Sequence, residues 1–222
     1  MKKQQSLSKI RQNPLGWKRY VYPLTRIEAQ TRGSDGSQLS FEYTRIEAER
    51  TTVEENQADP LVLDLDGDGI ELSTAREGVD FDVTGDGNKE KTAFTTGDDG
   101  FLAADWNGNG MIDSGRELFG DQNGAVNGFA ELSKHDSNQD EKIDQEDDIY
   151  SKLLVYRELN GDGISQANEL ASLADYGILS LSLKAQNAAL TSNGNSITQI
   201  GSYNRQDGSK GLMGDVWLNY LA

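Results

Sequence analysis

The alternation of apolar and polar residues predicts short strands through much of the chain. Two alternating stretches, which contain the related words TRIEAQ (Thr25–Gln30) and TRIEAE (Thr44–Glu49), flank a GSDG turn and predict a β-hairpin. PLVLDL, from Pro60, is a continuous apolar run typical of a buried strand, and ILSLSLK, from Ile178, alternates as a strand does. The last segment ends DVWLNYLA, and we expect it to add strands that return to close the sheet.

Two segments favour helices instead. IYSKLLVYREL places Ile149, Leu153 and Tyr156 on one helical face, and LASLADYG has the pattern of a short helix that ends at Gly177. Because an acidic loop precedes each segment, the order is loop–helix–loop–helix. The pattern therefore predicts the α+β class, with short strands and helices in one domain.

Five acidic loops separate these elements and begin at Asp64, Asp82, Asp105, Asp136 and Glu158. Oxygen-bearing side chains at positions 1, 3 and 5, with glycine at position 6, are how a backbone wraps a hard cation. Two unit charges about 4 Å apart repel by roughly 1 kcal/mol in water and roughly 4 kcal/mol in a partly buried site. The loops therefore predict EF-hand-like calcium sites with two to four bound Ca²⁺ ions.

The candidate ligands include side-chain oxygens and, at position 7, main-chain carbonyls. They are Asp64, Asp66 and Asp68; Asp82, Thr84, Asp86, Asn88 and Glu90; Asp105, Asn107, Asn109, Met111, Asp113 and Glu117; Asp136, Asn138, Asp140, Lys142, Asp144 and Asp147; and Glu158, Asn160, Asp162, Ile164 and Glu169.

The loops differ in how well they match an EF-hand. The Glu158 loop has the full length, with Glu169 at position 12, but begins with a longer acid than the usual Asp. In the Asp136 loop, Glu141 occupies the position where a sharp turn favours glycine. Glu117 comes one residue later than the template, and the Asp64 and Asp82 loops precede no predicted helix. The last two loops begin 22 residues apart, a spacing that resembles the doubled calcium repeat of dockerins.

Charge separates the chain into two parts. Residues 59–222 carry 30 acidic and 11 basic residues, a net charge of −19, whereas residues 1–58 carry 7 and 10. The acidic part disfavours nucleic acid and anionic membranes as partners. No apolar run is long enough for a membrane span, and MKKQQSLSKI lacks the apolar stretch of a signal peptide. The absence of cysteine excludes disulfides and thiolate chemistry and is compatible with an extracellular protein.

These observations predict the domain organisation. Residues 1–20 form a basic flexible arm, residues 21–56 a β-hairpin or small sheet, residues 57–60 a junction, and residues 60–222 the calcium-binding module. The junction contains Asp59-Pro60, the one Asp-Pro bond in the chain. The Asp side chain can attack its own main-chain carbonyl through a five-membered ring, and the proline nitrogen leaves readily once protonated. Proximity favours such an intramolecular attack by many kcal/mol when the geometry is held.

Five stretches between about Ala58 and Leu183 match one known module in order and spacing: ADPLVLDLDGDGIEL, FDVTGDGNKEKT, DDGFLAADWNGNGMIDSGRELFGD, NGFAELSKHDSNQDEKID and LNGDGISQANEL. Their resemblance is to the self-processing module of FrpC-like repeat-in-toxin (RTX) proteins. It implies that calcium folds the module, which then cuts the Asp-Pro bond at its own front edge. Asp59 would be the reacting residue and Pro60 the new N-terminus. The freed Asp59 would pass through an anhydride that water opens, or that a lysine amine opens to give an isopeptide cross-link.

Two functions remain open. The first is a calcium-triggered module that cleaves itself once and cross-links Asp59 to a lysine-bearing protein. The second is a non-catalytic, calcium-stabilised module of adhesin or dockerin-like type that binds a peptide or another ligand. The glycine-rich nonapeptide repeats that usually accompany the module do not occur in this sequence, so type I secretion is not directly supported. We expect an extracellular or secreted bacterial protein.

Overall fold

The computed structural model describes residues 55–221 and the backbone of five strands at residues 11–12, 18–19, 25–32, 38–45 and 51–52. The chain divides into two units, Met1–Glu54 and Glu55–Ala222. In the first unit, β1 (Arg11–Gln12), β2 (Lys18–Arg19) and β5 (Thr51–Thr52) form an antiparallel sheet, and β3 (Thr25–Arg32) pairs antiparallel with β4 (Gln38–Arg45). The predicted turn at 33–36 and most of the predicted flexible arm over 1–20 lie outside the described residues.

The second unit is built on one antiparallel sheet of twelve strands. Its main path runs β11-β14-β16-β17-β7-β10-β12-β13, while β15, β6, β9 and β8 attach beside it. The strands are β6 (Glu55–Ala58), β7 (Leu61–Asp64), β8 (Val79–Phe81), β9 (Glu90–Thr92), β10 (Gly100–Ala103), β11 (Lys142–Asp144), β12 (Leu154–Tyr156), β13 (Leu170–Ser172), β14 (Ile178–Ser182), β15 (Gln186–Ser192), β16 (Asn195–Arg205) and β17 (Lys210–Leu221).

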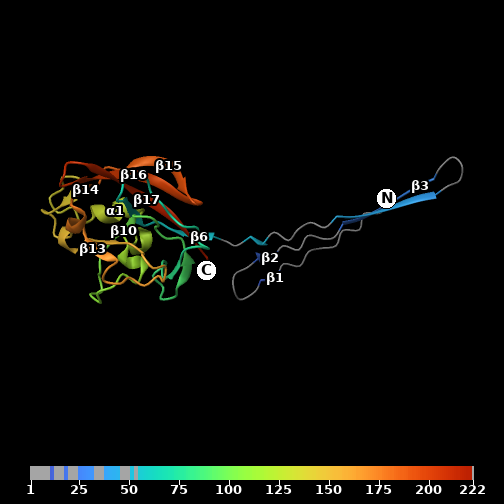
Figure 1. Ribbon diagram of the computed structural model, residues 1–222, viewed down its shortest axis with the longest axis horizontal. Coiled ribbons are helices and arrows are strands. Elements are labelled where there is room, and N and C mark those ends of the chain that lie inside the picture. The colour runs from blue at the N-terminus through green and yellow to red at the C-terminus, as the bar shows by residue number, and fades with distance from the viewer. Residues whose placement is uncertain are drawn as a thin grey trace. The chain divides into compact units, whose positions relative to one another are not determined.

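The C-terminal strand β17 is the spine of this sheet. It pairs with β16 along one edge and with both β7 and β6 along the other, and its end also contacts β9. Figure 1 shows β15, β16 and β17 as long curved strands along one side of the unit. The prediction that the C-terminal segment returns to close the sheet is therefore confirmed.

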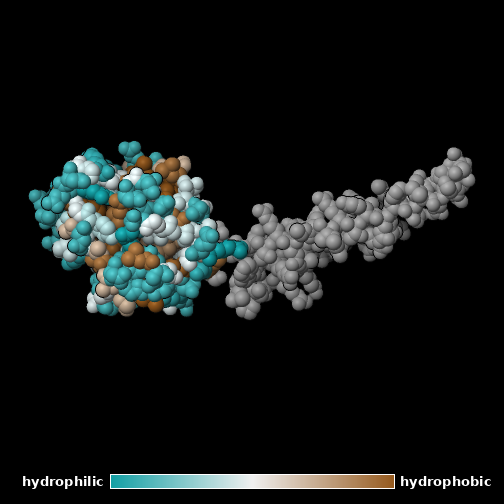
Figure 2. All heavy atoms as spheres, in the orientation of Figure 1, coloured by the Kyte–Doolittle hydropathy of each residue, from teal (hydrophilic) through white to brown (hydrophobic). Residues whose placement is uncertain are grey.

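Both faces of the sheet are covered by apolar side chains. Along β7, Leu61 and Leu63 belong to one apolar cluster and Val62 to the other, so this strand is buried on both sides, as its continuous apolar run predicts. Edge-to-face aromatic contacts pack the second cluster, with Phe94 and Phe101 ring centroids 4.7 Å apart. Figure 2 shows hydrophilic residues over much of the visible face, with smaller apolar patches between them.

The α+β prediction with several EF-hand-like helices is wrong, because the unit is mostly antiparallel sheet. Among residues 55–221 there is one α-helix, α1 (Gly128–Ser133), whose N-terminus is capped by Asn127. The other helical pieces are the 3₁₀ turns η1 (Gly115–Glu117), η2 (Asp121–Asn123), η3 (Tyr150–Lys152) and η4 (Leu173–Tyr176). None of the helices in this described part has the length and apolar character to span a membrane.

The segment predicted as a helix after the Asp136 loop shows why the prediction failed. Its apolar residues Ile149, Leu153 and Tyr156 are all buried, but in the short turn η3 followed by strand β12. The strand forms because β12 pairs with β10 on one side and β13 on the other. Hydrogen bonds to two neighbouring strands thus override a weak helical periodicity. Since β12 and β13 flank it, the Glu158 loop connects strands rather than helices.

Candidate metal loops and the Asp59–Pro60 junction

The five acidic loops share one backbone conformation. In each, the residues at positions 4 and 6 have positive φ angles, for example 80° at Gly161 and 66° at Gly163. Glycine adopts this conformation without steric cost. In the Asp136 loop the two positions are Gln139, at 59°, and Glu141, at 65°, so this loop takes the same turn with side chains that disfavour it.

The first acid of each loop holds this turn together. Asp105 accepts hydrogen bonds from the backbone N–H groups of Gly108 at 2.7 Å and Gly110 at 2.8 Å. Asp64, Asp82, Asp136 and Glu158 each accept at least two N–H bonds from the same part of their own loops. The backbone wraps around one carboxylate in every loop, so the five loops present their remaining oxygens in the same way.

A second, buried carboxylate lies behind each loop. Glu169 accepts bonds from the N–H groups at positions 2 and 9 of the Glu158 loop, and Asp147 does the same for the Asp136 loop. Glu117 accepts the N–H of Asp113 in the Asp105 loop, and Glu90 faces the Asp82 loop near Thr84. We call these buried acids the closing carboxylates; together with the one described next, they are Glu90, Asp99, Glu117, Asp147 and Glu169.

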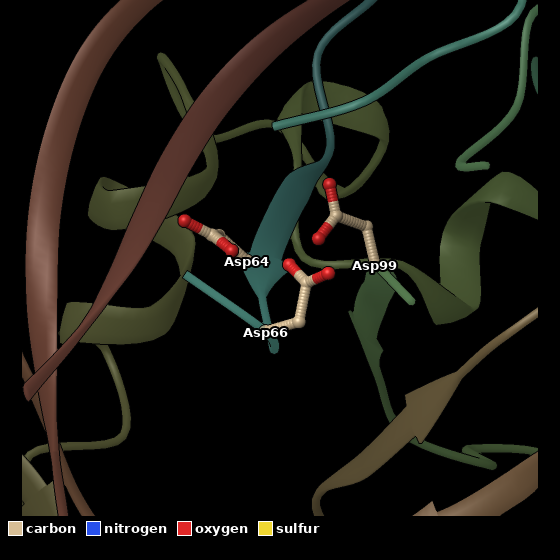
Figure 3. Close-up of side chains that lie close together, drawn as sticks. All are labelled: Asp64, Asp66 and Asp99. Atoms are coloured by element: carbon tan, nitrogen blue, oxygen red, sulfur yellow. The ribbon is translucent and has the colours of Figure 1, made fainter. Parts of the chain in front are cut away.

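Asp99 closes the Asp64 loop from another strand. It lies immediately before β10, and Gly100 of β10 is opposite Leu63 of β7, so the pairing brings Asp99 beside Asp64. Its carboxylate accepts the N–H of Glu71 at 2.6 Å and that of Leu65 at 3.4 Å. Figure 3 shows Asp64 at the end of β7, Asp66 on the segment that follows β7, and Asp99 on the segment that leads into β10. Each offers a carboxylate oxygen, and these oxygens all lie within 4.8 Å of one another.

The charges in this cluster interact unfavourably without a cation. Burial raises the pKa of Asp99 to about 7, with smaller contributions from the Asp64 and Asp66 carboxylates, while the N–H bonds of Glu71 and Leu65 act in the opposite direction. A bound divalent cation would compensate the same charges and keep the carboxylates ionised.

Two closing carboxylates also have an oxygen without a partner. Within the described part of the chain, Glu90 Oε2 and Glu117 Oε1 are buried and accept no hydrogen bond. Burial raises the pKa of both carboxyls. Buried polar atoms are rarely left unpaired, and an oxygen-binding cation supplies such a partner. The Asp82 and Asp105 loops therefore fit a hard cation.

The Asp136 loop differs because it contains a lysine. The Lys142 ammonium group lies 3.1 Å from Asp140 and also contacts Asp144, and these two carboxylates raise its pKa. The ammonium thus neutralises two of the predicted ligands. A metal ion in this loop would require that the Lys142 side chain move away, while its predicted contribution, the main-chain carbonyl, stays in place.

The remaining predicted ligands lie where the loops meet solvent. Among them, Asp82, Thr84, Asp105, Asp136, Asp144 and Glu158 are half-buried, and the exposed ones are Asp68, Asp86, Asn88, Asn107, Asn109, Met111, Asp113, Asn138, Asn160, Asp162 and Ile164. Each loop is therefore buried at its base and open to solvent at its tip.

The Asp59–Pro60 junction lies inside the sheet. Ala58 of β6 is opposite Leu218, and Leu61 of β7 is opposite Asp215, so β6 and β7 pair with β17 in one continuous register. Between them, Asp59 and Pro60 are buried, and the Pro60 carbonyl accepts the N–H of Val216 at 3.1 Å. Proline has no N–H to donate, so the ladder is interrupted at this bond while both sides are fixed.

The Asp59 side chain is in an acidic environment. It accepts the backbone N–H of Asp121 at 2.6 Å. Burial raises the pKa of Asp59 to about 8, with further contributions from the carboxylates of Asp121 and Asp215 and from a hydrogen bond between the Asp59 and Asp121 carboxyls. Near neutral pH, a large share of Asp59 therefore carries a proton, unlike an ordinary aspartate.

Three residues at these sites were not predicted from the sequence. Asp99 is 35 residues from Asp64, and Asp121 and Asp215 are even farther from Asp59, so loop spacing contains no signal for them. Only the fold brings them together. Asp98 precedes Asp99 in the sequence, but of the two it is Asp99 that is buried.

The fold and the site together define an antiparallel β-sheet protein with repeated acidic loops around a buried Asp-Pro junction. Comparison with known proteins then shows that the chain belongs to the SPM domain family, whose model matches residues 61–219. The chain is also 47% identical over 170 residues to the iron-regulated protein FrpA of Neisseria meningitidis serogroup C. This match covers 72% of the chain but 15% of the relative. Both findings fit the FrpC-like resemblance at the family level.

Proposed function

We propose that this chain is a calcium-binding module that cleaves its own Asp59–Pro60 bond. The calcium sites would be formed by the five loops, with two to four of them occupied. In each, the first acid, the oxygens at positions 3 and 5 and the carbonyl at position 7 would face the ion, and the closing carboxylate would complete the site. The unpartnered oxygens of Glu90 and Glu117 and the convergence of Asp64, Asp66 and Asp99 support this assignment.

Calcium would supply charge compensation and fix the loops, whereas the chain itself supplies the reacting groups. The observation that carries the cleavage proposal is the position of the Asp59–Pro60 bond. The bond is buried, β17 pairs with the strands before and after it, and the pKa of the Asp59 carboxyl is about 8. A side chain held next to its own carbonyl needs no further ordering before it reacts.

The reaction would first form a cyclic anhydride at Asp59 and release the Pro60 nitrogen. A carboxyl oxygen of Asp59 bonds to the Asp59 main-chain carbonyl carbon, the bond from that carbon to the Pro60 nitrogen breaks, and the carboxyl proton goes to the departing nitrogen. Water then opens the five-membered anhydride at Asp59 to leave two carboxyl groups. A lysine amine would open it instead with formation of an amide bond, so a lysine-bearing protein is the proposed partner.

The test is a time course of intact mass and denaturing gels at neutral pH, in millimolar calcium or in chelator. We expect fragments that end at Asp59 and begin at Pro60 in calcium only, and none in an Asp59→Ala variant. Species heavier than the parent chain would indicate cross-linking. The cleavage proposal is falsified if the wild-type chain stays intact for hours in calcium.

A second candidate is a calcium-stabilised ligand-binding module, and a surface cavity favours it. The cavity has a volume of about 580 Å³ and is lined by Trp106, Arg116 and His135 among others. The Trp106 ring stacks on His135, with centroids 5.6 Å apart. A chain that stays intact in calcium but captures a peptide in a calcium-dependent manner would support this second function.

We also propose that the module acts outside the cell as part of a secreted protein. Support comes from the similarity to FrpA and from the millimolar calcium that such loops would meet there.

A further inference from the structure

The segment from Phe119 to Asp121 covers the Asp59–Pro60 bond. On one side of that bond, the Phe119 carbonyl accepts the N–H of Leu61 at 2.8 Å. On the other side, the Asp121 N–H donates to Asp59 Oδ1 at 2.6 Å. Gly120 lies between these two contacts. The segment thus spans the bond and makes a hydrogen bond to the residue on either side of Pro60.

Gly120 is needed for close approach rather than for its backbone conformation. Its φ of −161° is an extended conformation that any residue adopts. A Cβ at this position would lie 2.8 Å from the Asp59 carbonyl oxygen, 3.2 Å from the carbonyl carbon and 3.3 Å from Oδ1. The main-chain carbonyl and the side-chain carboxyl of Asp59 therefore both face Gly120, and a methyl group there would displace one of them or the segment.

We propose that Gly120 and Asp121 are positioning residues for the cleavage of the Asp59–Pro60 bond. This inference rests on the proposed self-cleavage. Gly120 lets the segment lie against the carbonyl that is attacked, and the N–H of Asp121 holds the Asp59 carboxyl beside that carbonyl through Oδ1. The carboxyl of Asp121 adds a second effect, because it faces Asp59 and favours the protonated form that the leaving nitrogen requires.

Two acidic residues face the Asp59 carboxyl, and they differ in solvent exposure and in hydrogen bonding. Asp215, on β17, is 1% exposed, and both its oxygens already accept hydrogen bonds, from the Gly128 N–H at 2.8 Å and the Thr198 hydroxyl at 2.9 Å. Asp121, on η2, is exposed and is hydrogen-bonded by the amide of Gln122 at 2.8 Å. Asp121 is therefore the neighbour that is in contact with solvent.

The test compares the pH dependence of self-cleavage in saturating calcium for the wild type and Asp121→Asn. The variant keeps the backbone N–H but loses the charge, so the pKa of Asp59 should fall. We expect cleavage to be about fivefold slower at pH 8 and within about twofold of wild type at pH 6. Asp80→Asn, which removes one charge from the exposed side of β8, is the matched control and should keep the wild-type profile.

A second variant tests the close approach. Gly120→Ala should lower the cleavage rate by more than about tenfold at every pH, while the Trp106 fluorescence response to calcium is retained. Equal slowing of Asp121→Asn at pH 6 and pH 8 would overturn the role of its carboxyl. Wild-type rates in both variants would overturn the inference while self-cleavage stands. A wild-type chain that never cleaves would instead overturn the proposed function, and the inference with it.

Discussion

At the scale of single residues, exposure separates the acidic side chains into two groups. The acids at the loop tips are in water, where their charges are screened, whereas the closing carboxylates are buried. A buried carboxylate is unfavourable unless hydrogen bonds or a cation compensate its charge. The closing carboxylates should therefore affect metal binding more than any acid at a loop tip.

Glu117→Gln tests this difference in the Asp105 loop. The amide keeps the size of the side chain but removes the charge of the unpartnered oxygen, so we expect calcium to bind this loop at least about tenfold more weakly. Trp106 follows Asp105 directly, and its fluorescence during a calcium titration measures the effect. Glu77→Gln, at an exposed turn, should leave the titration unchanged, and equal affinities in both variants would contradict the prediction.

At this scale the sequence also predicted where the loops turn. The repeated oxygens and glycines identify all five loops, because the turn that wraps a carboxylate needs positive φ at fixed positions, and glycine marks these positions in four loops. The structure gives the fifth loop the same turn with Gln139 and Glu141. Asp99, Asp121 and Asp215 could not be found in this way, since their role depends on strands that are distant in sequence.

At the scale of elements, each loop is positioned by the strands around it. The loops that resemble EF-hands lack the pair of flanking α-helices. β12 and β13 flank the Glu158 loop, and the Asp136 loop, although it follows α1, continues into β11, which pairs with β14. The predicted helix over 149–156 had apolar residues at helical spacing, yet its burial is achieved by a 3₁₀ turn and a strand. Local periodicity does not reveal such pairing, whereas the buried run of β7 and the alternation of β14 were sufficient to predict those strands.

Asp99→Asn tests a site that depends on two elements. We expect weaker calcium binding at the Asp64 loop, by about tenfold or more, because β10 supplies the closing carboxylate of a loop that follows β7. The neighbouring Asp98 is the matched control, since its carboxylate points to Arg157 at the surface. Calorimetric titration of Asp99→Asn and Asp98→Asn measures the calcium affinities. An equal loss of affinity in both variants would argue against a site shared between the β7 loop and the start of β10.

At the scale of the whole module, the charge and the sheet have opposite effects on stability. The net charge of −19 over residues 59–222 favours expansion, while the two apolar clusters on either side of the sheet favour the compact state. β17 pairs with β16, β7 and β6 in one sheet. The acidic loops and the Asp59–Pro60 bond are therefore parts of the same sheet. Under the proposed function, loop occupancy would influence the Asp59–Pro60 bond through the shared sheet.

Removal of calcium is the test at this scale. At calcium 100 times the dissociation constant, each occupied site contributes about 2.7 kcal/mol. Two to four sites would thus contribute about 5 to 11 kcal/mol, which is comparable to the entire stability of a typical domain. We therefore expect an Asp59→Ala variant, which cannot cleave, to lose its cooperative thermal transition in chelator and to regain it in calcium. Magnesium at the same concentration should not restore it, because Mg²⁺ demands a smaller octahedral shell and retains its waters. A transition that is unchanged in chelator would mean that the apolar clusters alone overcome the repulsion, and that the loops hold their shape through hydrogen bonds without a metal.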